Sequence, residues 1–250
     1  MSPVVASSKA RKPGPGLRQQ RALETMGVQI WVSRLKTASE PDLMPVSMPT
    51  PVQLSSVAAD EPDSSVLAWT ALKAEVAACT QCALHQTRTQ TVFGSGSQQA
   101  RWLVIGEAPG ADEDRQGEPF VGRAGQLLTE MLRAVGLARE QVFIANILKC
   151  RPPENRDPKP EEAKSCENYL QRQIDLIRPG LILAVGRIAA QNLLQVDTPI
   201  GKLRGQAHAY GPVRIPVVVT YHPAYLLRSP GQKARAWDDL CLARSIVAPA

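Results

Sequence analysis

Residues 106–125 read GEAPGADEDRQGEPFVGRAG and join a short apolar run to a segment with helical spacing. The run before them, residues 102–105, is apolar throughout, which is typical of a buried parallel strand. The segment after them, residues 126–137, places apolar side chains at helical intervals. Ligands of open α/β sheets bind beyond the carboxyl ends of the strands. This loop, with its five glycines and five acidic residues, is therefore the first candidate for a functional site.

The chain on either side of this loop continues the alternation of strand and helix. Further strands are expected at residues 142–145, 181–185 and 215–220, and helices at residues 66–78, 160–178, 187–194 and 233–246. Such alternation predicts an α/β fold, in which helices cover both faces of a parallel sheet. Glu107, Asn146 and His222 come directly after strands. Because the carboxyl ends of parallel strands share one edge, we expect these three side chains to converge.

Length and composition fit one sizeable folded domain with residues to spare. The chain has 250 residues, of which 44% are hydrophobic, enough for a substantial core. No apolar run is long enough to span a bilayer, and the N-terminus lacks the apolar core of a signal peptide. We therefore expect a cytoplasmic protein without membrane contact. In that compartment the five cysteines are expected to be ligands or buried thiols rather than disulfides.

Positive charge is concentrated at the N-terminus. Residues 1–40 carry seven Lys and Arg against two Glu, a balance of +5 out of the net +6. The remaining residues are close to neutral, so any nucleic-acid contact of the folded core has to come from local clusters.

Composition divides the chain into three parts. Residues 1–36 predict a basic extension with a short helix–strand element, residues 37–65 a linker rich in Pro and Ser, and residues 66–250 the main domain. We expect the extension to dock on the main domain or on a protein partner. The alternative is a basic arm that contacts DNA.

Four of the cysteines come from three separated segments of the main domain. They are Cys79, Cys82, Cys150 and Cys166. The first two form a C-x2-C pair, and together the four suit one tetrathiolate site for zinc or for an iron–sulfur cluster. Four unrelated buried thiols are the alternative. The fifth, Cys241, has apolar neighbours on the last predicted helix and is expected to lie in the core.

Four motifs, in this order along the chain, resemble those of the type-4 (iron–sulfur) uracil-DNA glycosylases. They are the four-cysteine pattern, the loop at residues 106–125, ANILKCRPP with NRDP at residues 145–158, and HPAYLLR at residues 222–228. The resemblance covers roughly residues 66–247. It implies an αβα sandwich with a four-stranded parallel sheet, and a structural 4Fe–4S cluster on the four cysteines. It also implies removal of uracil from single- or double-stranded DNA as the first step of base excision repair.

Base recognition can be assigned from the chemistry of uracil. A flipped base needs a closed pocket, and Phe120 is the candidate for stacking on the planar ring. Gly106 and Glu107 are also expected to contact the substrate. The amide of Asn146 donates and accepts at once, which matches the O4 and N3–H edge of uracil and opposes that of cytosine. His222 can donate to O2 and stabilise the charge left on the departing base. The alternatives are a core Phe and a loop-capping Asn.

The group that activates water is less evident. In the type-1 uracil-DNA glycosylases, as the resemblance aligns them, the corresponding stretch carries a catalytic Asp where this chain has Ala108 and a bulky Tyr where it has Gly110. Glu107 is therefore expected to contribute to catalysis, by orienting water or by stabilising a cationic sugar. Contact with the base alone is the alternative. A dissociative path with an oxocarbenium-like sugar needs less help from a strong base.

DNA contacts are expected from basic side chains and from one apolar wedge. The basic candidates are Arg151, Arg156, Lys202, Arg204 and Arg228. Leu226 or Leu227 would fill the gap left by the flipped base. The acidic run at residues 112–114 repels phosphate and is better suited to helix capping and loop hydrogen bonds.

The sequence suggests three rival functions. A nucleotide-binding α/β protein lacks support, because residues 106–125 match neither a P-loop nor a Rossmann fingerprint. An inactive or product-trapping DNA-damage binder of the same fold is the main alternative. A wider substrate range stays open because Gly110 leaves the pocket mouth uncrowded. A monomer is expected by default.

Overall fold

The computed structural model describes residues 64–247. The predictions for the basic extension and for nearly all of the linker fall outside the described residues. The first described helix, α2 (Ser64–Ala77), already begins at Ser64. This helix therefore includes the last two residues of the predicted linker.

A six-stranded sheet in the order β1-β3-β2-β4-β6-β5 forms the centre of the described part of the chain. Its four inner strands are parallel, as predicted: β3 (Phe143–Asn146), β2 (Trp102–Gly106), β4 (Leu181–Val185) and β6 (Ile215–Thr220). The four-strand prediction was wrong in the total, because two antiparallel edge strands were missed. They are β1 (Ser95–Gly96) and β5 (Ala207–Tyr210). β1 is only two residues long, and the AHAY segment of β5 is half-exposed. Neither has enough apolar pattern to predict a strand from the sequence.

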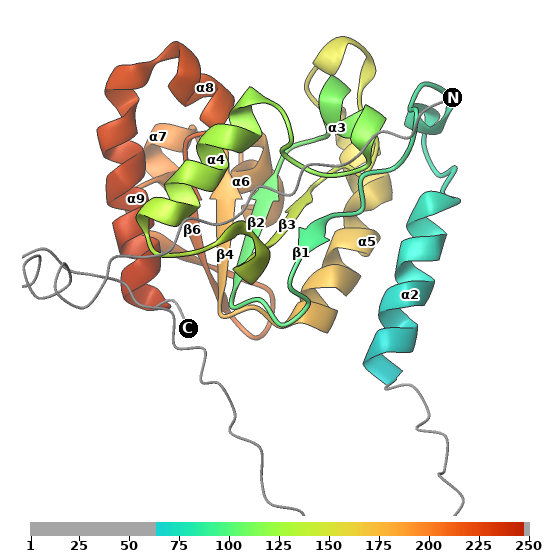
Figure 1. Cartoon of the computed structure of the whole chain (residues 1–250), viewed down its shortest axis with the longest axis horizontal. Coiled ribbons are helices and arrows are strands. Elements are labelled where there is room, and N and C mark those ends of the chain that lie inside the picture. The colour runs from blue at the N-terminus through green and yellow to red at the C-terminus, as the bar shows by residue number, and fades with distance from the viewer. Residues whose placement is uncertain (1–63, 248–250) are drawn as a thin grey trace, which may run out of the picture. The chain divides into compact units, whose positions relative to one another are not determined.

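Helices cover both faces of this sheet, which confirms the predicted αβα architecture (Figure 1). α2, α5 (Pro160–Ile177) and α6 (Arg187–Leu194) share one core with Leu103, Ile105 and their neighbours in register. α4 (Arg123–Ala134), α8 (Pro223–Arg228) and α9 (Lys233–Ile246) share the other with Trp102 and Val104. Successive residues of a strand point to opposite faces, so a continuous apolar strand supplies both cores.

Short elements complete the described chain. They are α3 (Ala111–Gln116), α7 (Ile200–Leu203) and the 3-10 turns η1 (Ala83–Gln86), η2 (Arg139–Gln141), η3 (Pro153–Asn155) and η4 (Pro230–Gln232). Among the helices of residues 64–247, none is long and apolar enough to cross a membrane.

The loop at residues 106–125 is held by its own acidic residues, as predicted. The Glu113 carboxylate accepts hydrogen bonds from the main-chain N–H groups of Gly110 (3.1 Å) and Val121 (2.9 Å). The buried Asp114 carboxylate accepts from the N–H of Thr89 at 3.0 Å. These carboxylates fix the path of the chain between β2 and α4, so that residues on the loop keep defined positions.

Candidate active site

Asn146 ends β3 with a buried side chain that has an unused acceptor. The residue is only 2% exposed, and its Oδ1 atom accepts no hydrogen bond from the described residues. An unpaired buried acceptor costs about 1–3 kcal/mol. Such a cost at a strand end indicates a place where a ligand supplies the missing donor.

Gly106 brings Asn146 and Phe120 together. A Cβ atom at Gly106 would lie 2.5 Å from Asn146 Oδ1 and 2.6 Å from the ring of Phe120. Only a residue without a side chain allows both groups to approach the end of β2 this closely. Asn146 and Phe120 therefore meet at the end of β2.

Phe120 is held in an unusual backbone conformation beside these groups. Its φ of 53° lies in the left-handed region, which a bulky side chain adopts rarely. Arg139 donates a hydrogen bond to the carbonyl oxygen of Pro119, which directly precedes Phe120. The Phe120 ring is 7% exposed and its centroid lies 5.6 Å from that of His222. Strain that the surroundings maintain in this way is typical of functional sites.

His222 completes the group from the end of β6. It forms the N-cap of α8, and its Nδ1 atom accepts a hydrogen bond from the N–H of Ala224 at 3.2 Å. A main-chain N–H can only donate, so in the neutral ring the proton is on Nε2. Burial, with Arg228 nearby, lowers the pKa of His222 to about 4, while Glu113 opposes the shift. His222 is therefore a neutral donor at physiological pH.

The end of β4 supports His222 through Gly186, which the sequence reasoning did not single out. Gly186 has a φ of 99°, and a Cβ atom there would lie 3.2 Å from the Cβ of His222. A glycine directly after a predicted strand was the only available signal. All four parallel strands thus contribute to one edge of the sheet.

Glu107 follows β2 and is half-buried at the same edge. Burial, helped by Asp157, raises the pKa of Glu107 to about 7, and Arg187 opposes the shift. Asp157 and Arg187 form an ion pair of 2.7 Å across the loop after β3 and the start of α6. Sequence reasoning missed this pair, since its members are 30 residues apart. A carboxyl group with this pKa exchanges its proton at neutral pH, which suits acid–base work.

The other two histidines lie elsewhere, as predicted. The Nδ1 atom of His85 lies 2.7 Å from the carbonyl oxygen of Cys82. The Nε2 atom of His208 lies 2.8 Å from that of Leu203. Neither belongs to the group at the sheet edge.

The structure divides the two predicted wedge residues. Leu226 is 1% exposed and packs in the core under α8, so its assignment as a wedge was wrong. Leu227, at 37% exposure, projects from the same short helix and is accessible. One position along a helix turns the side chain by about 100°, which explains the opposite exposures.

The predicted basic contacts divide in the same way. Arg204 is committed to the interior, because it pairs with the buried Asp239 at 2.7 Å and stacks 4.3 Å over the ring of Tyr221. Arg156 pairs with Glu162 through two hydrogen bonds of 2.8 and 2.6 Å. Arg151 is half-exposed and donates to Asn155.

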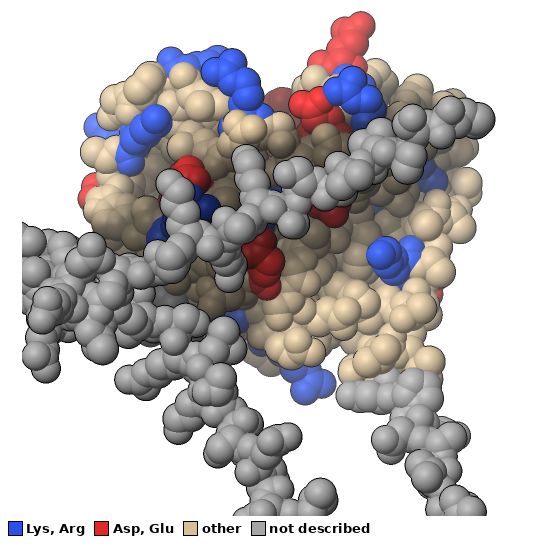
Figure 2. Space-filling view, viewed as in Figure 1, with Lys and Arg blue, Asp and Glu red and all other residues tan. Residues whose placement is uncertain are grey.

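Lys202 and Arg228 are exposed. Lys and Arg side chains gather over α8 and the start of α9, on the side to which the carboxyl ends of β2 and β4 point (Figures 1 and 2). Besides Arg228, this surface includes Lys233 and Arg235.

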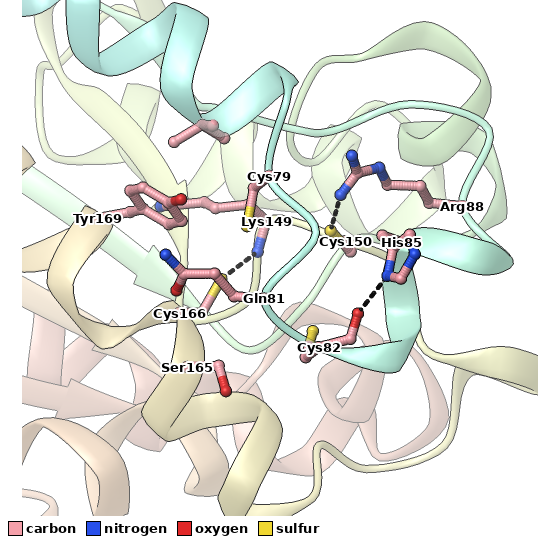
Figure 3. Close-up of a pocket in the computed structure, with 11 residues that line it drawn as sticks. Cys79, Gln81, Cys82, His85, Arg88, Lys149, Cys150, Ser165, Cys166 and Tyr169 are labelled. Carbon is pink, nitrogen blue, oxygen red and sulfur yellow. Dashed lines mark hydrogen bonds between the residues drawn. The ribbon is translucent and has the colours of Figure 1, made fainter.

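The four predicted cysteine ligands line one pocket (Figure 3). The pocket is small and is also lined by Arg88, His85 and Lys149. The Arg88 guanidinium donates to Cys150 Sγ at 3.0 Å, and the Lys149 N–H donates to Cys166 Sγ at 3.3 Å. Donors aimed at sulfur stabilise thiolates. The lining therefore suits an anionic tetrathiolate centre.

Burial affects the protonation of two of these thiols. Burial raises the pKa of Cys150, and it raises the pKa of Cys166 to about 11. Free thiols of this kind are inert, whereas metal coordination removes the proton. Cys241, by contrast, is exposed on α9, so its predicted core position was wrong.

Within residues 64–247, no group of three or more His, Cys, Asp and Glu side chains is arranged to hold a metal ion. The four cysteines nevertheless line one pocket from three separated segments, and thiolates are ligands of both zinc and iron–sulfur clusters.

Comparison with known proteins agrees with this geometry. Residues 93–241 match the Uracil DNA glycosylase superfamily, which defines the class of the fold and of the site at its edge. A type-4 uracil-DNA glycosylase of Archaeoglobus fulgidus is 49% identical over 163 residues, covering 62% of this chain and 81% of the relative. Those of Sulfurisphaera tokodaii and Thermotoga maritima are each 43% identical, covering 67% and 68% of this chain and 80% and 89% of the relatives. The chain belongs to the type-4 uracil-DNA glycosylases.

Proposed function

We propose that this protein is a monofunctional uracil-DNA glycosylase that hydrolyses the N-glycosidic bond of deoxyuridine in DNA and leaves an abasic site for base excision repair. Membership of the type-4 family supports this reaction. The observation that carries the assignment is the buried, unpaired Oδ1 of Asn146 beside Phe120 and His222. The Asn146 acceptor matches the N3–H of uracil, and the Phe120 ring matches the face of the base. The neutral N–H of His222 matches O2.

Recognition requires the base to leave the helix stack. The flipped uracil stacks on Phe120, beside the closed end of β2 at Gly106. Asn146 accepts from N3–H and donates to O4. Cytosine presents an acceptor at N3 and a donor at N4, so the same amide would face two unpaired contacts. Discrimination follows because each unpaired buried group costs about 1–3 kcal/mol.

Bond cleavage relies on His222 as a fixed donor. When the glycosidic bond breaks, negative charge spreads to O2 of the departing uracil. The Nε2–H of His222 donates to that oxygen, and the N–H of Ala224 keeps the ring in the required tautomer. Because the imidazole is neutral before reaction, it stabilises the developing anion without transferring a proton beforehand.

Glu107 serves the sugar side of the reaction. In its ionised form, the carboxylate stabilises the oxocarbenium-like sugar and orients the water that attacks it. The pKa of about 7 makes this form available at neutral pH. Ala108 offers no carboxylate, so Glu107 is the acid–base group that this chain supplies at the end of β2.

The DNA is held around the flipped nucleotide by α8 and the loop after β3. Leu227 fills the gap in the base stack, and Arg228 and Arg151 contact phosphates. Both single- and double-stranded DNA are substrates, since the pocket reads only the flipped base.

We further propose that the protein acts as a monomer in the cytoplasm, that residues 66–250 form the catalytic domain, and that the linked basic extension at residues 1–36 binds a protein partner.

A 4Fe–4S cluster is proposed on Cys79, Cys82, Cys150 and Cys166, which fit it by the shared cavity and by the donors from Arg88 and Lys149. When bound, the cluster cross-links the segment after α2, the loop after β3 and α5. No step of the reaction uses it.

The test is excision from a duplex with one uracil opposite guanine, followed by alkali, compared with a duplex that carries cytosine at that position. Strand cleavage after alkali on the uracil duplex alone is expected. Asn146→Asp should lower uracil excision by about 100-fold or more, since an ionised carboxylate cannot donate to O4. A brown protein without abasic product would refute the enzyme and favour a damage-binding member of the fold.

The cofactor is tested separately on the same preparation. A broad absorbance band near ~400 nm is expected from thiolate-ligated iron. Cys166→Ser should remove it, while Cys241→Ser, on the exposed face of α9, should leave it unchanged. A zinc-containing, colourless protein that still excises uracil would refute only the cofactor.

A further inference from the structure

Lys149 is a fully buried lysine whose ammonium group reaches the backbone of the uracil-reading residue. Its side chain is 1% exposed. The Nζ atom donates to the main-chain carbonyl of Asn146 at 2.9 Å and to Oε1 of Gln173 at 2.6 Å. A buried ammonium is costly unless its hydrogen bonds are satisfied. Here both acceptors are buried as well, so the lysine is tied firmly to the two residues.

The contact with Asn146 complements the pairing of the sheet. On the other side of β3, the N–H of Ile147 donates to the carbonyl of Gly106 at 2.9 Å, and Asn146 is in register with Gly106. Beyond Asn146 the strand ends, and its carbonyl is held by a side chain instead of a further strand. Lys149 thus takes the place of the missing ladder partner at the residue whose orientation decides base recognition.

The remaining partners of Lys149 anchor it to α5 and to the cysteine pocket. Gln173 is fully buried and donates from Nε2 to the carbonyl of Phe93 at 2.9 Å. The main-chain N–H of Lys149 donates to Cys166 Sγ. One residue therefore contacts both a cysteine of the pocket and the backbone of Asn146.

We propose that Lys149 is a positioning residue that sets the Asn146 amide for uracil, rather than a general core residue. This inference rests on the proposed function, because it assigns Lys149 to the pocket that reads uracil. It acts through Asn146 alone. Removing the ammonium therefore costs uracil recognition only while the Asn146 amide is present.

A double-mutant cycle tests this. Lys149→Met keeps length and removes both donor contacts, and Asn146→Ala removes the amide. We expect Lys149→Met to lower the single-turnover rate on the uracil–guanine duplex by about 10- to 100-fold, as a misplaced recognition group does. In the Asn146→Ala background it should lower the rate less than about 3-fold, since residues that act as a unit are non-additive. Equal losses in both backgrounds would overturn the proposal.

Gln173→Met is the matched control, because it removes the other acceptor and leaves the contact between Lys149 and Asn146. Calorimetry with free uracil gives a readout independent of turnover. The dissociation constant should rise in Lys149→Met and stay near wild type in Gln173→Met. A rise in both variants would mean a general loss of packing and would refute a specific role.

Folding and function are checked on the same samples. The melting temperature and the absorbance near ~400 nm report folding and the cysteine centre. If Lys149→Met does not fold, Lys149→Leu, which also removes both donor contacts, replaces it in the cycle with the same criterion. Wild-type protein that excises uracil, with an additive cycle, refutes only the role of Lys149. Wild-type protein that does not excise uracil refutes both proposals.

Discussion

Replacing Gly106 by alanine tests the geometry of the uracil pocket most directly. The added Cβ would lie 2.5 Å from Asn146 Oδ1 and 2.6 Å from the Phe120 ring. Both distances are far inside ordinary van der Waals contact. Gly106 is part of β2 and pairs with β3, so the backbone cannot retreat without breaking the sheet. The two side chains have to move instead.

The size of the effect follows from those distances. Restoring normal contact requires each group to shift by close to 1 Å, and a misplacement of about 1 Å in a reacting complex costs about 100-fold in rate. We therefore expect Gly106→Ala to lower the single-turnover rate on uracil DNA by about 100-fold, equivalent to about 2.7 kcal/mol of transition-state stabilisation. Overpacking should lower the free energy of unfolding by about 1–3 kcal/mol, leaving the protein folded.

The assay is single-turnover excision with enzyme in excess, so that product release does not limit the rate. Gly201→Ala is the control, because a Cβ atom there would meet nothing within 4 Å. It should match wild type in rate and in melting temperature. Wild-type excision by folded Gly106→Ala would show that Asn146 and Phe120 do not form the uracil pocket together.

Three further predictions follow from the same structure. The pKa of His222 is about 4 in the folded protein and about 6.5 in the unfolded chain, so between these pH values only the unfolded state gains this proton. Lowering the pH from 7 to 5 should therefore reduce the unfolding free energy of wild type by about 2 kcal/mol more than that of His222→Gln. Urea titrations at the two pH values measure this difference. The excision rate should rise with pH around a midpoint near 7 as Glu107 ionises, and a pH–rate profile of Glu107→Gln should lack this limb; an unchanged limb would assign it to another group. Leu226→Ala should lower the unfolding free energy by about 2–5 kcal/mol because the side chain is buried. Leu227→Ala should keep the stability of wild type, and its excision rate should fall more on duplex DNA than on single-stranded DNA.

The position of the site could be predicted from sequence because it follows from topology. Four apolar runs alternating with helices define a parallel sheet, and the polar residues after them then meet at one edge. Asn146, His222 and the loop with Phe120 were found in this way. The grouping of the cysteines followed from the four-cysteine pattern and the family resemblance.

Two features could not be predicted from the sequence: which face of a short helix is buried, and which residues far apart in the sequence pair with each other. Leu226 and Leu227 are adjacent in HPAYLLR, and a six-residue helix is too short to reveal its buried face by periodicity. Arg204 has the composition of a DNA contact, yet Asp239, 35 residues away, takes it into the interior. Lys149 lies inside a quoted motif, but only the fold reveals that it is buried against Gln173 of α5.

The two sites of this domain share one short segment of chain. Asn146 ends β3 at the proposed uracil pocket, and Cys150, four residues later, lines the cysteine pocket. Ile147 and Leu148 between them are hydrogen-bonded to the main chain of β2 and the loop after it. So short a buried segment, held along its length, cannot relax at one end without straining the other. A change in the cysteine pocket should therefore reach base recognition. Variants of its lining should be judged by uracil discrimination as well as by stability.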